Sequence, residues 1–460
     1  MHIEALQLKH ILHFPEIQLQ LDYSQYPLTL ILGNQGTGKT TLLRCAYQAL
    51  TWFAARYRDS RAAGLVIPDQ DIMQHRLQSK IDIRVGFPEE VSALTESSQT
   101  EAAQQQSFSW QVYKTLNSQG LGFSKAETAQ LDSMLGLYQK ARFNDPLLGL
   151  PLIAYYPADR FVNDVNLISK NNPAIFHTAY AYDIGAIPFT TFARFFEWLR
   201  EVSDIENAQS AKIMDQILAR ALQQPEDIRG DELAWQIEKA QAQLHTPHLT
   251  ALKNALSQVL PDISQIELKY QPRLQLMLTY QDKRFTFQQL PNSIRTWIAL
   301  VGDIVRRLCL LNPNSLFPCQ EGTGVLLIDA IDHQLDQDLA AEILPRLHQA
   351  FPNLQIIATG NRPELLEHAQ AFQCLRLENK QLHPIHLESM KIQFDQIYAE
   401  MGLHTDPDAI PAEEALIETV TEPTTPLAVL QRIQQQLNPE QQQELLRLLA
   451  QDQPTLPQSL

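Results

Sequence analysis

One short motif constrains this chain more than any other feature. Residues 33–40 read Gly33-Asn-Gln-Gly-Thr-Gly38-Lys39-Thr40 and match the pattern Gly-x-x-x-x-Gly-Lys-Ser/Thr in full. Before the motif stands the continuous apolar run 28–32, which is typical of a strand buried on both faces of a parallel sheet. After it, from Lys39 to about Tyr57, apolar residues recur at helical spacing. A strand, a Gly-rich turn and a helix in this order predict a P-loop within an α/β fold.

The chemistry of this turn follows from its backbone. Glycines allow successive amide N–H groups to point inward around phosphate groups, and the helix N-terminus adds a favourable dipole. The Lys39 ammonium is expected to reach the β- and γ-phosphates, and the Thr40 hydroxyl to bind Mg²⁺. The predicted nucleotide-binding residues are Gly33, Asn34, Gln35, Gly36, Thr37, Gly38, Lys39, Thr40 and Thr41.

A second apolar run, Val325-Leu-Leu-Ile-Asp329, ends in an aspartate. An apolar strand that ends in Asp is the usual Walker B partner of a P-loop, and the carboxylate of this Asp orients the water shell of the metal ion. We therefore add Asp329 to the predicted nucleotide site and take Thr40 and Asp329 as the magnesium residues. The predicted cofactors are ATP and Mg²⁺.

Strand and helix patterns alternate along the chain, which predicts an α/β core built around a parallel sheet. Two alternating stretches, 81–87 and 108–113, predict an inserted antiparallel hairpin, and residues 266–287 predict two more strands. The predicted segments are 1–57, the N-terminal half of the core with the P-loop; 58–187, a β-rich insertion and a return strand; 188–260, a helical lid; 261–403, the C-terminal half with Asp329; 404–427, a linker; and 428–460, a small helical tail.

Composition excludes several classes of function. No run of about 18 apolar residues is present, which predicts no membrane span. The beginning of the chain lacks the pattern of a signal peptide. The four cysteines show no metal-ligand spacing. We expect a cytoplasmic protein. The net charge of −16 does not indicate direct DNA binding, although a local basic groove remains possible.

Five segments together resemble a known group of ATPases. They are 1–40, Ala154-Tyr-Tyr-Pro-Ala-Asp-Arg160, 195–207, 289–307 and 325–363. In order and spacing they resemble the head of ABC/SMC/RecF-type P-loop ATPases, and more specifically the overcoming-lysogenization-defect and Septu PtuA-like ATP-binding proteins. The resemblance covers most of residues 1–400. It implies an ABC/SMC-like α/β head with an antiparallel β insertion, a helical lid and a small helical tail, and a role in anti-phage defence or DNA maintenance.

Several motifs depart from the pattern of that family. Its Walker B aspartate is followed by a glutamate that polarises the attacking water, but Ala330 stands there in this chain. Its signature Leu-Ser-Asp-Gly corresponds to Leu290-Pro291-Asn292-Ser293, in which proline offers neither hydroxyl nor N–H. Its switch histidine corresponds to Asn361, and its Leu-His-Leu-His-Pro segment to residues 333–337. A single lost glutamate could be an engineered trap, whereas several altered motifs favour natural drift.

These departures predict a protein that binds ATP without hydrolysing it efficiently, so no catalytic residue is assigned. The loss of one charge-stabilising group typically costs about 10²–10³ in rate. Asp332 or Glu321 could replace the missing carboxylate, but the spacing recommends neither. For Arg160 the sequence leaves two alternatives open, a surface arginine at a strand end or a residue that approaches the nucleotide.

Three functions remain open from the sequence. The first is a nucleotide-binding subunit that uses ATP as a structural or conformational ligand in a complex, either as a homodimer or with an effector protein. The second is an active dimeric ATPase, or one whose site a partner chain completes. The third is a direct DNA-binding module, against which the acidic balance argues.

Overall fold

The computed structural model describes residues 1–93, 107–117, 120, 122–162, 178–182, 189–190, 192–223 and 247–385. The chain divides into two units, Met1–Met390 and Lys391–Leu460. Every described residue belongs to the first unit. The predicted linker at 404–427 and the tail at 428–460 lie outside the described residues.

A six-stranded sheet forms the core, in the order β16-β15-β3-β14-β13-β7. All neighbouring strands are parallel except the edge pair of β15 and β16. Every residue of β3, β13 and β14 is buried, as their apolar sequences predict. The strands are β3 (Leu28–Leu32), β7 (Leu152–Tyr156), β13 (Gly324–Ile328), β14 (Leu354–Gly360), β15 (Phe372–Glu378) and β16 (Gln381–Pro384).

The parallel strands bring the carboxyl ends of β3, β14 and β13 to one edge of the sheet. Gly360 at the end of β14 pairs with Leu32 at the end of β3, and Ile328 at the end of β13 pairs with Ala358. The P-loop follows β3 and Asp329 follows β13, so both predicted motifs lie at this edge. Ligands of open α/β sheets bind at such an edge.

A second sheet is antiparallel, in the order β2-β1-β4-β5-β6. Its strands are β1 (His2–Ile11), β2 (Phe14–Gln20), β4 (Gln78–Gly86), β5 (Ser107–Leu116) and β6 (Gly122–Glu127). The stretches expected to form a separate hairpin are therefore β4 and β5 of a sheet that also contains the first two strands. Register explains the difference, because β1 pairs with β4 from His2 opposite Gly86 to Lys9 opposite Lys80.

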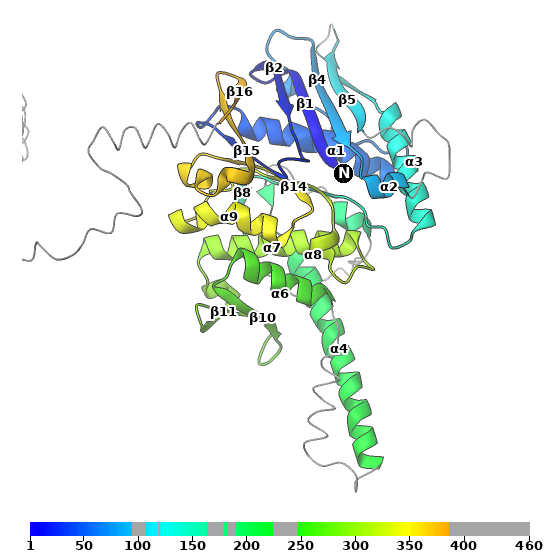
Figure 1. Ribbon diagram of the computed structural model, residues 1–460, viewed down its shortest axis with the longest axis vertical. Coiled ribbons are helices and arrows are strands. Elements are labelled where there is room, and N and C mark those ends of the chain that lie inside the picture. Colours follow the sequence, from blue (N-terminus) through cyan, green and yellow to red (C-terminus); the bar gives the residue numbers. More distant parts are fainter. Residues whose placement is uncertain are drawn as a thin grey trace, which may run out of the picture. The chain divides into compact units, whose positions relative to one another are not determined.

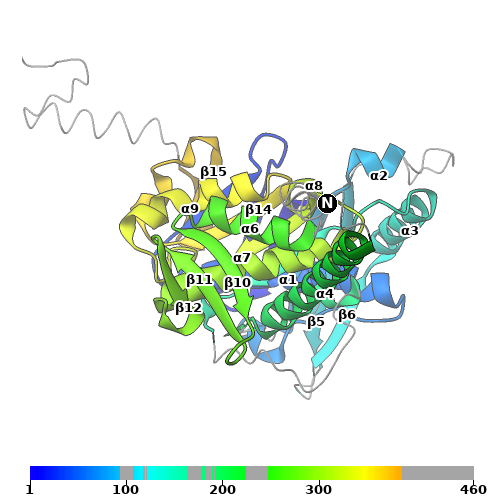
Figure 2. The ribbon, with the colours of Figure 1, turned by 90° about the horizontal axis from the view of Figure 1, so that it is seen from below.

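Helix α1 (Lys39–Arg58) joins the two sheets. It contacts β4 of the antiparallel sheet and β7 of the core, and fourteen of its residues are buried. Figures 1 and 2 show α7 and α9 on the core beside α6 (Pro247–Val259). The other helices that belong to this part of the chain are α2 (Glu89–Ala93), α3 (Ala129–Asn144), α7 (Asn292–Leu311), α8 (Pro318–Glu321) and α9 (Gln337–Ala350).

Short elements complete the described chain. The two-residue strands β8 (Asp159–Arg160) and β9 (Phe189–Thr190) pair in parallel. The single-turn helices are η1 (Asp69–Asp71), η3 (Thr178–Tyr182), η4 (Phe287–Gln289), η5 (Pro363–Leu366) and η6 (Ala369–Ala371).

The predicted helical lid contains two described helices. Helix α4 (Ala193–Gln223) runs away from the core in Figure 1, and α6 (Pro247–Val259) packs against α7 and α9. Beside α6 lies another antiparallel sheet, made of β10 (Ile263–Lys269), β11 (Gln275–Tyr280) and β12 (Lys283–Thr286). The expected pair of strands over 266–287 is thus three strands. The additional turn is Gln281-Asp282, where both residues have positive φ.

The fold class expected from the sequence is confirmed. A parallel α/β core carries the P-loop and the Walker B strand, an antiparallel sheet lies beside it, and helices follow.

Candidate nucleotide site

Two glycines of the P-loop differ in how much room a side chain would have. Gly38 has φ +105°, and a Cβ there would lie 2.4 Å from both His13 Nε2 and Phe14 Cζ. Gly36 has φ +78°, but a Cβ there would meet nothing within 4 Å. The hairpin between β1 and β2 therefore closes on the end of the loop, where His13 Nε2 lies 3.0 Å from the carbonyl oxygen of Thr37. Because a carbonyl only accepts, His13 is the donor in this contact.

Lys39 lies folded back over the loop that it follows. Its ammonium donates to the carbonyl of Gly33 and, at 2.9 Å, to that of Asn34. Burial lowers the pKa of Lys39, while the negative charges of Asp329 and Asp332 oppose that shift. The ammonium thus lies over the loop, where a phosphate chain would need it.

The other predicted loop residues divide by exposure. Thr40 is exposed in the first turn of α1, which leaves its hydroxyl accessible to a metal ion. Thr41 is buried, so its side chain packs into the protein. Asn34 and Gln35 are exposed. The hydroxyl of Thr37 donates to the Asn34 carbonyl at 2.9 Å and tightens the loop.

Asp329 fits the role of a magnesium ligand because only one of its two carboxylate oxygens has a hydrogen-bond partner among the described residues. Oδ1 accepts a hydrogen bond of 2.6 Å from Thr359 Oγ1, and Oδ2 is buried without a partner among the described residues. A buried carboxylate oxygen without a donor is costly unless a ligand satisfies it. Carboxylate oxygens are ligands that Mg²⁺ prefers, so Thr40 and Asp329 are the residues that would hold the ion.

Arg160 is buried, with 5% of its surface exposed. Its guanidinium donates to the carbonyls of Pro157, Asp329 and Ala330. Burial lowers the pKa of Arg160 to about 10, although the Asp329 carboxylate opposes the shift. Of the two alternatives left by the sequence, the surface arginine is wrong. Arg160 instead holds the turn after β13 through its hydrogen bonds to the carbonyls of Asp329 and Ala330.

At two of the positions that depart from the family pattern, the side chain has no group that could position or polarise an attacking water. Ala330 has φ +46°, and its N–H donates to Thr359 Oγ1 at 2.8 Å. Asn361 is exposed, and its backbone N–H donates to Asp332 Oδ2. Pro291 precedes α7 and gives that helix no side-chain cap. At Ala330 and Pro291, therefore, neither a carboxylate nor a hydroxyl is available.

Sequence reasoning missed Thr359 and His13. Thr359 directly follows the apolar residues 356–358, just as Asp329 follows 325–328, and this parallel could have revealed it. His13 gave no signal, because its contact with the P-loop depends on how the hairpin between β1 and β2 folds.

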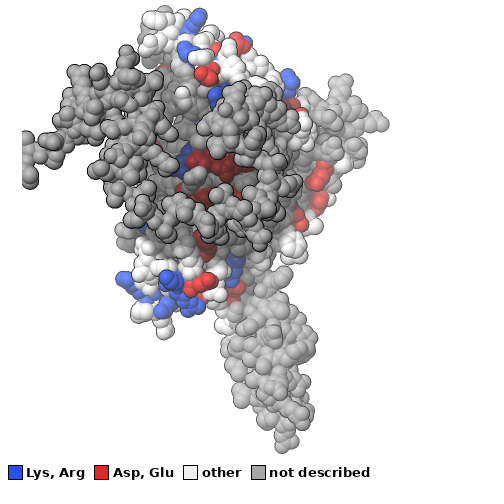
Figure 3. Space-filling model, turned by 60° about the vertical axis from the view of Figure 1, so that its left-hand side comes forward, with Lys and Arg blue, Asp and Glu red and all other residues white. Residues whose placement is uncertain are grey.

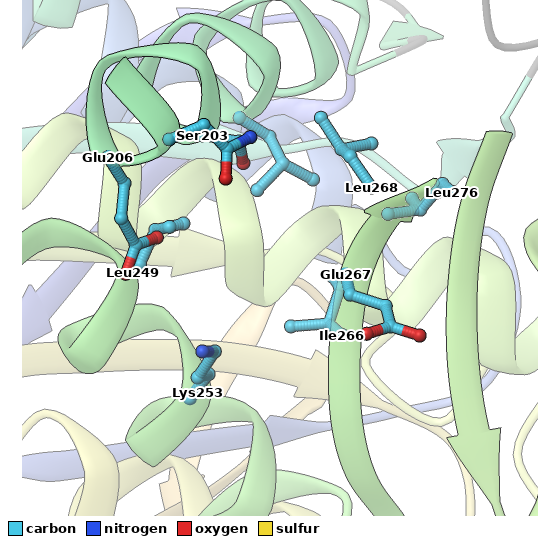
Figure 4. Close-up of a pocket in the computed structure, with 10 residues that line it drawn as sticks. Ser203, Glu206, Leu249, Lys253, Ile266, Glu267, Leu268 and Leu276 are labelled. Carbon is cyan, nitrogen blue, oxygen red and sulfur yellow. The ribbon is translucent and has the colours of Figure 1, made fainter. Parts of the chain in front are cut away.

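A separate pocket of about 200 Å³ lies between α4, α6, β10 and β11, none of which carries a predicted site residue. Figure 4 shows Lys253, Glu206 and Glu267 around leucine and isoleucine side chains. It is thus distinct from the predicted nucleotide site.

Figure 3 shows Lys and Arg side chains gathered over the sheet of β10, β11 and β12. The exposed charged residues of this sheet and its turns are Lys269, Arg273, Lys283 and Arg284, with Glu267 and Asp282 among them. Glu267 lies 3.8 Å from Arg284. The surface is therefore of mixed charge, and it does not form the broad basic patch that direct DNA binding would favour.

The described part of the chain holds neither a ready-made metal cluster nor a membrane span. Within it, no group of three or more His, Cys, Asp or Glu side chains could hold a metal ion by itself. No described helix is long and apolar enough to cross a membrane.

Comparison with known proteins decides the family. The family model described as "AAA domain" matches residues 5–264, which is more than half of the chain. The chain belongs to the AAA domain family. This confirms the coarser part of the resemblance, a P-loop ATPase domain.

Two curated relatives bear retron names. The AAA domain protein is 27% identical over 374 residues to the "Retron Ec83 probable ATPase" of Escherichia coli, covering 73% of this chain and 64% of that protein. It is 25% identical over 368 residues to the "Retron Vc95 probable ATPase" of Vibrio cholerae serotype O1 biovar El Tor, covering 76% and 68%. The chain thus spans about two thirds of the length of these relatives.

Among solved structures, the AAA domain protein is similar to an Smc head bound to the C-winged helix domain of ScpA. The TM-score is 0.45 at 11% sequence identity, over 85% of this chain and 100% of that chain.

Proposed function

We propose that this chain is the ATP-binding subunit of a larger assembly, holding Mg–ATP through its P-loop and Asp329 while hydrolysing it slowly. The observation that carries the proposal is the contrast within one site. The loop, Lys39 and the unsatisfied Asp329 oxygen suit a phosphate chain and its metal. Ala330 and Pro291 carry no side chain that could position or polarise a water.

ATP then acts as a conformational or assembly ligand. A ligand stabilises whichever state binds it more tightly, and hydrolysis is not needed for that effect. The assembly is either a homodimer or a complex with an effector protein. Likeness to the two retron ATPases supports a place in a retron-encoded system, and the finer grouping with Septu PtuA-like defence proteins belongs to the same proposal.

Thermal or urea unfolding with and without Mg–ATP tests the binding step. A ligand at 100 times its dissociation constant stabilises the folded state by about 2.7 kcal/mol. We expect stabilisation of the wild type, its loss in Lys39→Ala, and its retention in Lys253→Ala, which removes an exposed lysine on α6. A wild type that Mg–ATP does not stabilise would contradict the proposal.

Analytical ultracentrifugation with and without Mg–ATP tests the assembly step. The homodimer version predicts that Mg–ATP raises the dimer fraction of the wild type but not that of Lys39→Ala. A wild type that binds ATP and stays monomeric would exclude the homodimer and leave the partner-chain version.

One alternative function keeps a specific observation on its side. An active ATPase completed by a partner chain would need that partner to reach the nucleotide edge, and the exposed Pro291 and Asn292 at the start of α7 leave that segment open to a partner. Addition of a candidate partner should then raise ATP turnover in a Lys39-dependent manner.

A further inference from the structure

A second carboxylate stands beside Asp329. Asp332 lies in the turn that follows β13 and is 7% exposed. Its Oδ2 accepts two backbone hydrogen bonds, from Asn361 N–H at 2.7 Å and from Arg362 N–H at 2.8 Å. Two amide donors on one oxygen hold the carboxylate in a fixed orientation.

The turn brings Asp332 to the P-loop edge of the sheet. Asn361 follows Gly360, which pairs with Leu32 immediately before the loop. A Cβ on Gly360 would lie 3.4 Å from Asp332 Oδ2, so the carboxylate packs against the end of β14.

The two carboxylates are held by one segment and share one pattern. Thr359 fixes Oδ1 of Asp329, and the amides of Asn361 and Arg362 fix Oδ2 of Asp332. In each side chain the other oxygen takes no hydrogen bond from the described residues, and that of Asp329 is also buried. Segment 359–362 thus orients both carboxylates and leaves one acceptor oxygen of each without a hydrogen bond.

We propose that Asp332 supplies the second carboxylate of the magnesium–nucleotide site, its Oδ1 accepting a hydrogen bond from a water bound to the ion. Mg²⁺ keeps several waters when it binds a nucleotide, and these need acceptors around them. Groups that hydrogen-bond to metal ligands typically tune metal affinity by about 10–100-fold. This role rests on the proposed function, and it places a carboxylate near the metal although Ala330 has none.

The other candidate that the sequence left open is excluded by position. Glu321 belongs to α8, which precedes the amino end of β13, and Ser315 donates to its carboxylate. The amino end of β13 is the edge of the sheet opposite the P-loop. Glu321 therefore serves as the matched control.

Asp332→Asn is the informative variant. The amide oxygen can still accept from Asn361 and Arg362, which leaves an NH₂ donor where Oδ1 was. Binding of a fluorescent ATP analogue to the full chain is measured over a range of free Mg²⁺ and again in EDTA. We expect the Mg²⁺ concentration for half-maximal binding to rise about 10-fold or more, with affinity in EDTA unchanged. Glu321→Gln should match the wild type in both.

Asp332→Glu checks that the carboxylate is responsible. It retains the charge and the acceptor, so its Mg²⁺ requirement should lie much nearer to wild type than that of Asp332→Asn. Equal shifts in the two variants, or a shift in Glu321→Gln of the same size, would overturn the inference.

The remaining outcomes separate this inference from the proposed function. Wild-type Mg²⁺ dependence in Asp332→Asn would overturn the inference and leave ATP binding intact. Loss of binding in EDTA as well would show that Asp332 only holds the loop, which also overturns it. A wild type that binds no nucleotide under any condition would instead remove the proposed function, and the inference with it.

Discussion

The two sides of the nucleotide edge differ in how many of the expected functional residues they carry. On the P-loop side, the glycines, Lys39 and the exposed Thr40 retain what phosphate binding needs. On the Walker B side, Asp329 remains, but Ala330 and Asn361 replace the expected glutamate and histidine. Phosphate binding depends mainly on backbone amides and one cation, whereas hydrolysis needs particular side chains around a water. This difference between the two sides is the basis of the proposal that the chain binds ATP but hydrolyses it slowly.

The Walker B side is nevertheless held by several hydrogen bonds. Arg160 and Thr359 hold the turn that contains Ala330, and Asp303 on α7 accepts from the Tyr156 hydroxyl at the end of β7. We infer that this side is retained to place Asp329 and Asp332 rather than a reacting water.

The largest expected effect concerns the frame behind the Walker B side. Asp303 is buried between Arg306 and Arg307, each at 2.8 Å. Asp303→Asn leaves both guanidinium groups without their counter-charge, so we expect the free energy of unfolding to fall by about 3–5 kcal/mol. Urea unfolding at pH 7 measures it, and Asp282→Asn at an exposed turn is the control. Equal stability of the Asp303 variant and wild type would contradict the brace.

The same pair makes a prediction about pH. Burial opposes ionisation of Asp303, but the two guanidinium groups outweigh it and hold the Asp303 pKa below its ordinary value of 3.8. The stabilisation is therefore fully present above that value and is lost as pH falls below it. The stability difference between wild type and Asp303→Asn should narrow below about pH 4, and a constant difference would refute this sign.

The next effect is on the P-loop side and compares two glycines. Gly38→Ala places a Cβ against His13 and Phe14 and also forces an alanine into a left-handed backbone conformation. We expect a cost of about 2–4 kcal/mol. Gly36→Ala carries the backbone cost alone, about 1 kcal/mol. ATP affinity and unfolding free energy, measured for both, should fall further in Gly38→Ala. Equal losses would show that the hairpin does not close on the loop.

A smaller effect is expected at Thr359, whose hydroxyl bonds to Asp329 and Ala330 on the Walker B side. Thr359→Val removes the hydrogen bond to Asp329 and the acceptor of the Ala330 N–H, so we expect a loss of about 1–3 kcal/mol in stability. Thr29→Val is a control in neighbouring β3, where the hydroxyl makes one long contact of 3.4 Å. Urea unfolding distinguishes them, and a control as damaging as the test variant would contradict this role of Thr359.

The smallest effect is expected for Ala330→Glu. The carboxylate returns, but Pro291 and Asn361 remain, and groups that act as a unit do not recover singly. We expect phosphate release to rise less than about 10-fold. A rise of about 100-fold would show that Ala330 alone limits hydrolysis, and the difference between the two sides would shrink to one residue.

The sequence predicted the elements whose signals are local. The apolar runs before Gly33 and Asp329 identified two buried strands, and the glycine spacing identified the loop between β3 and α1. It could not predict that β1 and β4 share a sheet, because that pairing joins residues about 80 positions apart. The roles of Arg160 and Asp332 were also hidden. Their partners lie 169 and 29 residues away, and only the folded sheet brings them together.

Steady-state ATP turnover by the purified chain, with Lys39→Ala beside it, tests the central claim most directly. The account predicts that both proteins release phosphate at the background rate while only the wild type binds Mg–ATP. Turnover by the wild type above about 0.1 per second, lost in Lys39→Ala, would approach the typical range of enzymes, which begins at about 1 per second. That result would contradict the claim that this site holds ATP without hydrolysing it efficiently.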